Sequence, residues 1–311
     1  MEIRRNSSHS TRLLSLSLLS MLFAFSAIAD EQTTWTLTNL GGPINTVHHE
    51  GFPAITKDGL ALYFARGISG VDGKKGQDWN IYVSTRPSLD ASWGEPRLLP
   101  DHINTDGAEH SVSFSPDGRW LYFSSTRLDT CGGLDIFRSY REDLSDELGW
   151  GPPQNLGCDV NTIEHDVCVI YHAEEDSGAA NLYFVSNRKG TSGDLDAWRI
   201  GFDPESGTYS EAEVLASVSS PVFDGHLDPE SGYLWTDREG GHGGGDIWHS
   251  DRDKQGNWLE PVNMGPGINT KYEEQLPAPF DHGRVIYFPS DRPGGSGGLD
   301  IYIAEKTTVD L

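Results

Sequence analysis

Residues 285–304 read VIYFPSDRPGGSGGLDIYIA, and the segments of this stretch recur in the same order along the chain. The apolar run 285–288 predicts a strand, the Pro and Gly residues that follow predict a loop, and residues 300–303 predict a second strand. A close copy, LYFSSTRLDTCGGLDIF, occupies residues 121–137. Weaker copies lie at residues 62–82, 182–198 and 233–248. Five copies indicate an internally repeated fold.

The spacing of two further signals supports the repeat. An Asn-Thr pair begins at Asn45, Asn104, Asn161 and Asn269, at intervals of 59, 57 and 108 residues, so that the last interval holds two units. A tryptophan opens a segment at Trp35, Trp93, Trp150 and Trp258. A period of about 56 residues in a chain of short strands predicts small sheets that cannot bury both faces alone and therefore pack against one another.

The order of segments within one unit predicts four antiparallel strands, which is the blade of a β-propeller. The last unit, from Gln275 to Glu305, supplies only three strands. The segment from Thr34 to Leu40 supplies a strand with no blade before it. We therefore predict an all-β, five-bladed β-propeller over residues 30–311, closed by the N-terminal strand, which completes the last blade.

The motifs of the repeat resemble those of a known family. The turn Ser-Pro-Asp-Gly at 115–118, the strand pattern L-Y-F-x-S-x-R and the strand pattern G-G-x-D-I-[YFW] resemble the TolB-type (PD-repeat, WD-like) β-propellers. The stretch 290–302 is similar to the five-bladed propellers that some OmpA-family outer-membrane proteins carry. The resemblance implies the propeller fold. It does not select a function, because this repeat serves protein binding, glycan binding and catalysis alike.

Residues 1–29 have the composition of a targeting segment. Three arginines, Arg4, Arg5 and Arg12, precede an apolar stretch at 13–28, and Ala27-Ile28-Ala29 is a small-x-small cleavage site. A membrane anchor is the alternative, but the apolar stretch is short and interrupted by serines. We expect a signal peptide cleaved after Ala29, a periplasmic or secreted protein, and no membrane insertion after cleavage.

The charge of the chain limits its partners. Residues 1–29 carry three arginines and one glutamate, so the remainder has 20 basic and 46 acidic residues, a formal net charge of −26. Such a surface repels nucleic acid and anionic lipid headgroups. We expect a monomer that binds an envelope protein or a glycan and no nucleic acid.

The three cysteines lie in neighbouring repeat units. Cys131 lies in the Gly-rich loop of the second unit and Cys158 in the connection to the third, and in a four-stranded blade these two segments open on the same face. We therefore predict a Cys131–Cys158 disulfide, which fits an oxidising compartment, and a buried free thiol at Cys168.

One carboxylate stands at the head of the innermost strand of every unit. These acids are Glu50, Glu109, Asp166, Asp224 and Glu274. They could form a ring of acids around the propeller axis. Alternatively, they are structural acceptors for backbone N–H or Arg donors from the neighbouring blade, as periodic residues of a repeat often are.

The histidines do not follow the repeat. His49, His110, His165 and His226 all lie within two residues of one of these acids. Strand alternation predicts that His226 points with Asp224 and that His110 points away from Glu109. A His/carboxylate cluster at the axis could bind a divalent cation, or it could supply an acid/base pair for glycan cleavage. We leave the cofactor open, since no H-E-x-x-H or G-x-S-x-G motif occurs.

Two function classes follow. The first is an exported binding or assembly module for an envelope protein or glycan, with Glu50, Trp79, His110 and Glu274 as binding residues and Trp79 as a stacking platform for a sugar ring. The alternative is a carbohydrate-active enzyme, a glycoside hydrolase or lyase, with Glu109, Asp166, Asp224 and His226 as catalytic residues. Five-bladed glycosidases place carboxylates on their innermost strands, so the alternative rests on an analogy of architecture.

Overall fold

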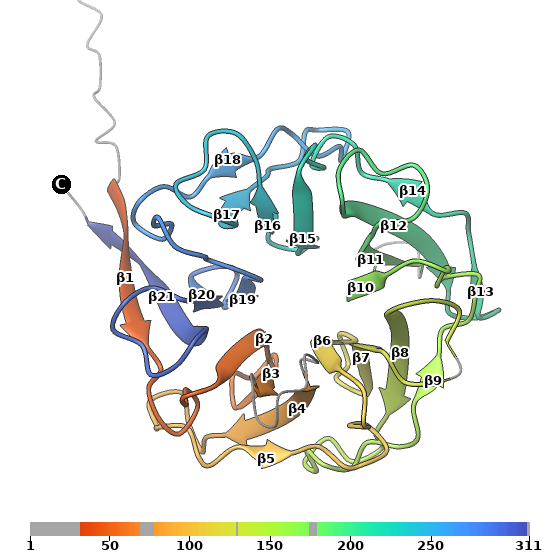
Figure 1. Ribbon diagram of the computed structural model, residues 1–311, viewed down its shortest axis with the longest axis horizontal. Helices are drawn as coiled ribbons and strands as arrows, with labels where there is room; N and C mark the ends of the chain where they lie inside the picture. The colour runs from red at the N-terminus through yellow and green to blue at the C-terminus, as the bar shows by residue number, and fades with distance from the viewer. Residues whose placement is uncertain (1–31, 69–77, 129, 174–178, 310–311) are drawn as a thin grey trace, which may run out of the picture.

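The computed structural model describes residues 32–68, 78–128, 130–173 and 179–309. The predicted signal peptide and the loop at 69–77 lie outside the described residues. Within these ranges the regular elements are strands, and they form five small antiparallel sheets around a central axis (Figure 1). The predicted all-β, five-bladed propeller is confirmed.

Each blade runs outward from an innermost strand. Blade one consists of β2 (His49–Ile55), β3 (Ala61–Ile68), β4 (Asp78–Thr85) and β5 (Arg97–Leu98). Blade two consists of β6 (Glu109–Phe114), β7 (Trp120–Ser125), β8 (Asp135–Tyr140) and β9 (Gln154–Asn155). Blade three consists of β10 (Asp166–Ala173), β11 (Ala180–Ser186) and β12 (Asp196–Asp203), with β13 (Thr208–Tyr209) and β14 (Glu213–Val214) both on β12. Its outer strand is therefore in two pieces, a departure from the predicted four strands.

The last two blades complete the ring. Blade four consists of β15 (Phe223–Leu227), β16 (Tyr233–Asp237), β17 (Asp246–His249) and β18 (Val262–Asn263). Blade five consists of β19 (Ala278–Phe280), β20 (Val285–Ser290), β21 (Asp300–Val309) and, outermost, β1 (Gln32–Asn39). The register of β1 on β21 runs from Gln32 opposite Val309 to Asn39 opposite Tyr302. The predicted closure by the N-terminal strand is confirmed, and β1 lies at the rim beside β21 in Figure 1.

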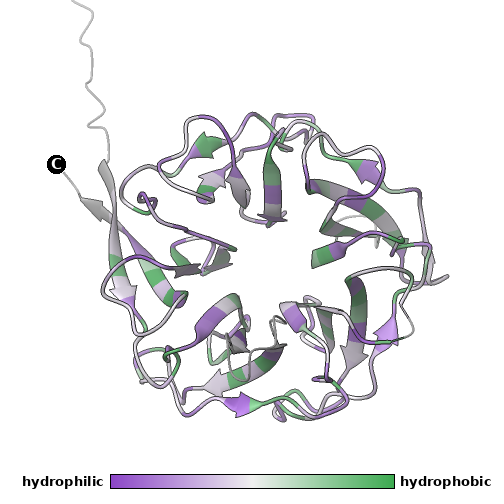
Figure 2. Cartoon of the chain, viewed as in Figure 1, coloured by the Kyte–Doolittle hydropathy of each residue, from purple (hydrophilic) through white to green (hydrophobic). Residues whose placement is uncertain are grey.

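The hydrophobic core lies between adjacent blades. Tyr63 and Val83 of blade one pack in one cluster with Val112 and Phe123 of blade two, and corresponding clusters join the other blades. The outer strands β5, β9 and β14 carry hydrophilic residues (Figure 2). Burial of large apolar and aromatic side chains, worth roughly 2–3 kcal/mol each, therefore holds the ring together blade by blade.

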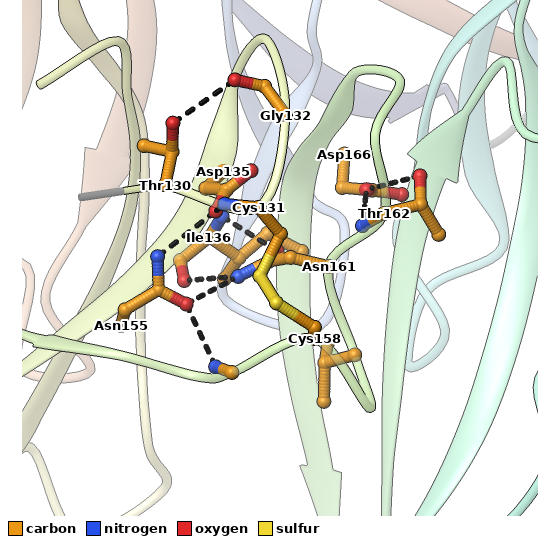
Figure 3. Close-up of a disulfide and its surroundings, with 12 residues drawn as sticks. Thr130, Cys131, Gly132, Asp135, Ile136, Asn155, Cys158, Asn161, Thr162 and Asp166 are labelled. Atoms are coloured by element: carbon orange, nitrogen blue, oxygen red, sulfur yellow. Dashed lines mark hydrogen bonds between the residues drawn. A yellow bond between two sulfur atoms is a disulfide. The ribbon is translucent and has the colours of Figure 1, made fainter. Parts of the chain in front are cut away.

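The Asn-Thr pairs join four of the five blades to the connection that leaves them. Asn161 accepts a hydrogen bond from the Ile136 backbone N–H at 2.8 Å and donates to the Ile136 carbonyl at 3.1 Å, as a neighbouring strand would. Asn155 donates to Asp135 at 2.9 Å and accepts from Asn161 at 2.9 Å (Figure 3). Asn45, Asn104 and Asn269 repeat the contact with Ile301, Ile81 and Ile247. This shared role explains the regular spacing of the asparagines.

The predicted disulfide is present. Cys131, before β8, is bonded to Cys158, after β9, and Cys168 is a buried free thiol. The bond lies beside the Asn155 and Asn161 contacts and reinforces the same connection (Figure 3).

We expect the Cys131→Ala variant to be less stable than the wild type by about 3 kcal/mol. The bridge closes a loop with a sequence separation of 27, and removing it restores the chain entropy of the unfolded state. Denaturant unfolding of both proteins measures the difference. The variant Cys131→Ala/Cys158→Ala is the control and should match the single variant. Equal midpoints for the wild type and both variants would contradict the prediction.

Candidate functional site: an axial funnel

The five periodic acids are structural acceptors. Glu109 is fully buried and accepts hydrogen bonds from the Thr105 N–H at 2.8 Å, the Thr105 hydroxyl at 2.7 Å and the Ser125 hydroxyl at 2.6 Å. Its carboxylate also faces Arg127 at 3.7 Å. The equivalent ion pairs are Arg66–Glu50 at 2.7 Å, Arg188–Asp166 at 2.5 Å, Arg238–Asp224 at 3.6 Å and Arg292–Glu274 at 2.9 Å.

These contacts tie the incoming connection to its own blade. The threonine belongs to the Asn-Thr turn before the blade, and the arginine follows the second strand of the same blade. The donors do not come from the neighbouring blade, in contrast to the expectation for structural acceptors. None of the five carboxylates lines either of the two axial cavities described below. The predicted catalytic Glu109, Asp166 and Asp224 therefore lie outside these cavities, as do the predicted binding residues Glu50 and Glu274.

A β-bulge follows the acid on the innermost strand. The pairing register shifts at this point in β2, β6, β10 and β15. The backbone is left-handed at Phe52, Ser111, Cys168 and Leu276, with φ between 41° and 59°. A bulge breaks the alternation of side chains and turns the extra residue toward a new direction.

The residues two positions after the five acids meet at the axis. Phe52, Ser111, Cys168, His226 and Leu276, one from each blade, line a small cavity of about 20 Å³. We call these five residues the axial ring. His226 lies in the axial ring, and His110 lines the larger cavity beside it. The register shift between Asp224 and His226 removes the strand alternation on which the predicted orientation of His226 rested, whereas the pairing of Glu109 and His110 is regular.

The larger cavity has a volume of about 450 Å³ and shares Phe52 with the axial ring. We call it the axial funnel. It is lined by Gly51, Phe52, Trp79, Ala108, His110, Leu134, Gln275 and Leu299. Among these described lining residues there is no Lys, Arg, Asp or Glu. The described lining is therefore uncharged and combines aromatic and aliphatic side chains with two polar ones, His110 and Gln275.

Trp79 forms one wall of the funnel. It precedes Asn80 as Leu134 precedes Asp135, so it takes the Leu position of the Gly-Gly-Leu-Asp motif. Its indole lies over Gly67, where a Cβ atom would come within 2.8 Å of the ring, and it contacts Phe52 edge-on at 5.4 Å between centroids. The glycine makes room for the indole.

His110 forms a polar part of the funnel lining. Its ring stacks on Phe52 with centroids 4.4 Å apart, and its Nδ1 lies 2.6 Å from the Ser111 hydroxyl. Burial lowers the pKa of His110 to about 4, so the imidazole is neutral at pH 7. Trp79 and His110 are the predicted site residues that the structure brings together in the funnel.

Gln275 is a funnel residue that the sequence did not reveal. Its amide donates to the Glu273 carboxylate at 3.3 Å, and Glu273 also accepts from the Gly245 N–H at 3.0 Å. Phe52, Leu134 and Leu299 were also missed. A usable signal existed for the leucines, because they occupy the same motif position as Trp79.

Two histidines accept hydrogen bonds from the backbone of funnel residues. The Leu134 N–H donates to His165 Nδ1 and the Leu299 N–H donates to His49 Nδ1, both at 3.1 Å. Each histidine thus fixes a loop that carries a leucine of the funnel wall. His49 and His165 have structural roles in this arrangement.

Two features are absent from the described residues. No group of three or more His, Cys, Asp or Glu side chains that could hold a metal ion occurs in the described ranges. No helix long and apolar enough to cross a membrane occurs in the same ranges.

We expect acid to destabilise the fold through its buried histidines. Burial lowers the pKa of His110 and of His226 to about 4, so between about pH 6.5 and 4 the unfolded state binds more protons and stability falls as the pH falls. Burial raises the pKa of Asp224 to about 6, which acts in the opposite direction as the pH falls through 6. Between pH 7 and 4.5, His110→Gln should lose about 2 kcal/mol less than the wild type. Urea unfolding at both pH values measures this, and equal losses would contradict it.

The fold and the funnel define a five-bladed propeller with a ligand-sized axial cavity. No protein-family model matches the chain, and no curated protein matches it in sequence. Similar folds occur among solved structures. The α-L-arabinofuranosidase of Podospora anserina, in complex with cellotriose, is 15% identical, with a TM-score of 0.54 over 88% of this chain and 97% of that chain.

Two further structures are similar. A GH62 hydrolase in complex with xylotriose is 13% identical, with a TM-score of 0.53 over 88% of this chain and 97% of that chain. A thermostable family-43 glycoside hydrolase is 14% identical, with a TM-score of 0.50 over 87% of this chain and 93% of that chain. At these identities the likeness concerns the fold.

The comparisons correct the expected family. The sequence motifs resembled TolB-type propellers, but no family model supports that assignment, and the similar solved structures are glycoside hydrolase propellers. The motifs misled because the Gly-Gly-x-Asp and Ser-x-Arg elements serve turns and connections that blade packing requires.

Proposed function

We propose that the protein is an exported carbohydrate-active propeller that binds a neutral glycan in the axial funnel. The observation that carries this proposal is the lining of the funnel. Trp79 offers an aromatic wall to the apolar face of a sugar ring, and His110 and Gln275 offer hydrogen bonds beside it. A volume of about 450 Å³ lies in the range of small-ligand sites. The lack of charged groups among the described lining residues favours a neutral ligand.

The comparisons support the carbohydrate-active class over a general binding or assembly module. The similar structures are glycoside hydrolases, two of them solved with the neutral oligosaccharides cellotriose and xylotriose. Export is proposed from the N-terminal segment, and the Cys131–Cys158 disulfide is consistent with an oxidising compartment.

Cleavage of the bound glycan is a second candidate function. Glycoside hydrolysis uses a carboxyl group beside the scissile bond. Glu273 is partly exposed and accepts a hydrogen bond from Gln275 of the funnel. The carboxylates of the periodic acids instead accept hydrogen bonds within their own blades, as Glu109 does from Thr105. Glu273 with the neutral imidazole of His110 is therefore the pair that we would test for catalysis, by comparing Glu273→Gln with the wild type on released reducing sugar.

We expect Trp79→Ala to weaken binding of neutral oligosaccharides by roughly 30-fold, about 2 kcal/mol, because the sugar loses its aromatic wall. An array of neutral and acidic oligosaccharides, followed by calorimetry on those bound, measures the change. Trp120→Ala is the matched control, since Trp120 opens β7 and lines neither axial cavity. A folded Trp79→Ala protein with wild-type affinity, or a wild type that binds acidic glycans alone, would refute the proposal.

A further inference from the structure

Three buried side chains form a hydrogen-bonded chain between the axial ring and the funnel. His110 Nδ1 lies 2.6 Å from Ser111 Oγ, and Ser111 Oγ lies 3.3 Å from Cys168 Sγ. The three residues are 8%, 6% and 7% exposed. His110 and Ser111 belong to β6 of blade two and Cys168 belongs to β10 of blade three, so the chain crosses from one blade to the next.

This combination departs from the repeat. The residues that correspond to His110 in the other blades are Gly51, Val167, Gly225 and Gln275. Those that correspond to Ser111 are Phe52, Cys168, His226 and Leu276. Stacking of the blades does not require an imidazole, a hydroxyl and a thiol in contact. In a repeat protein such a departure is where selection for function is expected.

The geometry indicates which group donates the proton in each of these two hydrogen bonds. Hydrogen bonds donated by a hydroxyl are shorter than those donated by a ring N–H, which centre near 2.9–3.0 Å, and the separation of His110 Nδ1 from Ser111 Oγ is 2.6 Å. A separation this short favours the hydroxyl as the donor. Burial also raises the pKa of Cys168 to about 11, so the thiol keeps its proton and can donate it to Ser111 Oγ.

A neutral imidazole carries one proton. If Nδ1 accepts the hydroxyl proton of Ser111, then Nε2 holds the N–H. No described residue hydrogen-bonds to Nε2, and the ring lines the funnel, so this N–H is available to a ligand. Stacking on Phe52 holds the plane of the ring.

We propose that Ser111 and Cys168 are positioning residues that hold His110 as the Nε2–H tautomer, which donates a hydrogen bond into the axial funnel. The ligand atom at this position is then an acceptor, such as a hydroxyl or ring oxygen of a neutral sugar. Gln275 supplies the complementary group, because its amide nitrogen faces the Glu273 carboxylate and its amide oxygen is left to accept a sugar O–H. The statement about the ligand rests on the proposed function; the statement about the tautomer does not.

The tautomer is measured on the ligand-free protein by NMR of imidazole nitrogens labelled with ¹⁵N at pH 7, with His110→Gln to assign the signals. We expect the wild type to show Nε2 protonated and Nδ1 unprotonated. Ser111→Gly removes the hydroxyl at a position whose φ of 59° suits glycine, and it should populate the Nδ1–H form. Cys168→Ser, which keeps a donor beside Ser111, should retain the wild-type pattern. A wild type with Nδ1 protonated, or a Ser111→Gly spectrum identical to the wild type, would overturn the proposal.

The ligand part is tested with cellotriose and xylotriose as probes. If one of them binds the wild type, Ser111→Gly should weaken its binding about tenfold, as expected for a lost hydrogen bond of about 1.4 kcal/mol. Unchanged affinity in a folded Ser111→Gly protein would refute the donor role of His110. If neither probe nor any other neutral oligosaccharide binds the wild type, the proposed function fails, while the NMR result still decides the positioning role of Ser111.

Discussion

A chain that begins at Leu40, and so lacks β1, is expected to lose cooperative folding. Removing β1 deletes the outer strand of blade five and exposes the backbone of β21, which pairs with it along all eight residues. Trp35 and Leu37 would also leave the apolar cluster of Ile268 and Tyr302. At about 1 kcal/mol for each net hydrogen bond, plus the lost apolar burial, the cost is on the order of 5–10 kcal/mol, comparable with the whole stability of a domain.

Thermal unfolding followed by circular dichroism measures this loss. Addition of a synthetic peptide with the sequence of residues 32–39 should restore the transition in proportion to its occupancy, since the peptide can supply the missing strand. A peptide with the same composition in scrambled order is the control. If the shortened chain keeps the wild-type melting temperature, ring closure by β1 contributes little and the prediction is wrong.

Replacing a periodic acid should be the second largest effect. In Glu274→Ala the Thr270 N–H, the Thr270 hydroxyl and the Ser290 hydroxyl lose their acceptor, and Arg292 loses its ion pair. Glu274 is fully buried, so these donors are left without compensation. Breaking a buried, hydrogen-bonded ion pair costs about 3–5 kcal/mol.

Denaturant unfolding tests this expectation, with Glu95→Ala as the control, because Glu95 is exposed and should change stability by less than about 0.5 kcal/mol. Glu109→Gln extends the test to a residue predicted to be catalytic. A structural acceptor loses stability on this change, whereas a catalytic acid loses turnover and keeps its stability. A Glu274→Ala protein as stable as Glu95→Ala would remove the structural explanation of the periodic acids.

The sequence predicted the fold well because the repeat encodes local structure several times over. Every unit has the same order of strands and four of them have the same Asn-Thr contact, so an unclear segment in one unit can be interpreted from the others. The closure by Thr34 to Leu40 followed from counting strands. The disulfide followed from the face on which two segments open. What failed was the family assignment, because those same motifs serve the construction of a blade, which unrelated propellers share.

The site was harder to predict because it depends on departures from regular strands. Periodicity assigns side chains to alternate faces, but the bulge at Phe52, Ser111 and Cys168 turns an additional residue toward the axis. A left-handed backbone conformation at a non-glycine residue cannot be recognised from the amino-acid composition of the strand. The sequence shows the acids as a periodic set. It does not show where their carboxyl groups point, because that depends on the hydrogen bonds that the preceding turns donate to them.

The separation between the acids and the bulges has an evolutionary consequence. Each blade keeps its shape through the contacts of its periodic acid, which lines neither axial cavity, while other side chains of the same blade line the axial cavities. A mutation can therefore replace one side chain that lines an axial cavity without breaking the contacts that hold the blades in shape. Divergence of ligand preference among such proteins should therefore concentrate at positions that line the funnel, such as 52, 79, 110 and 275.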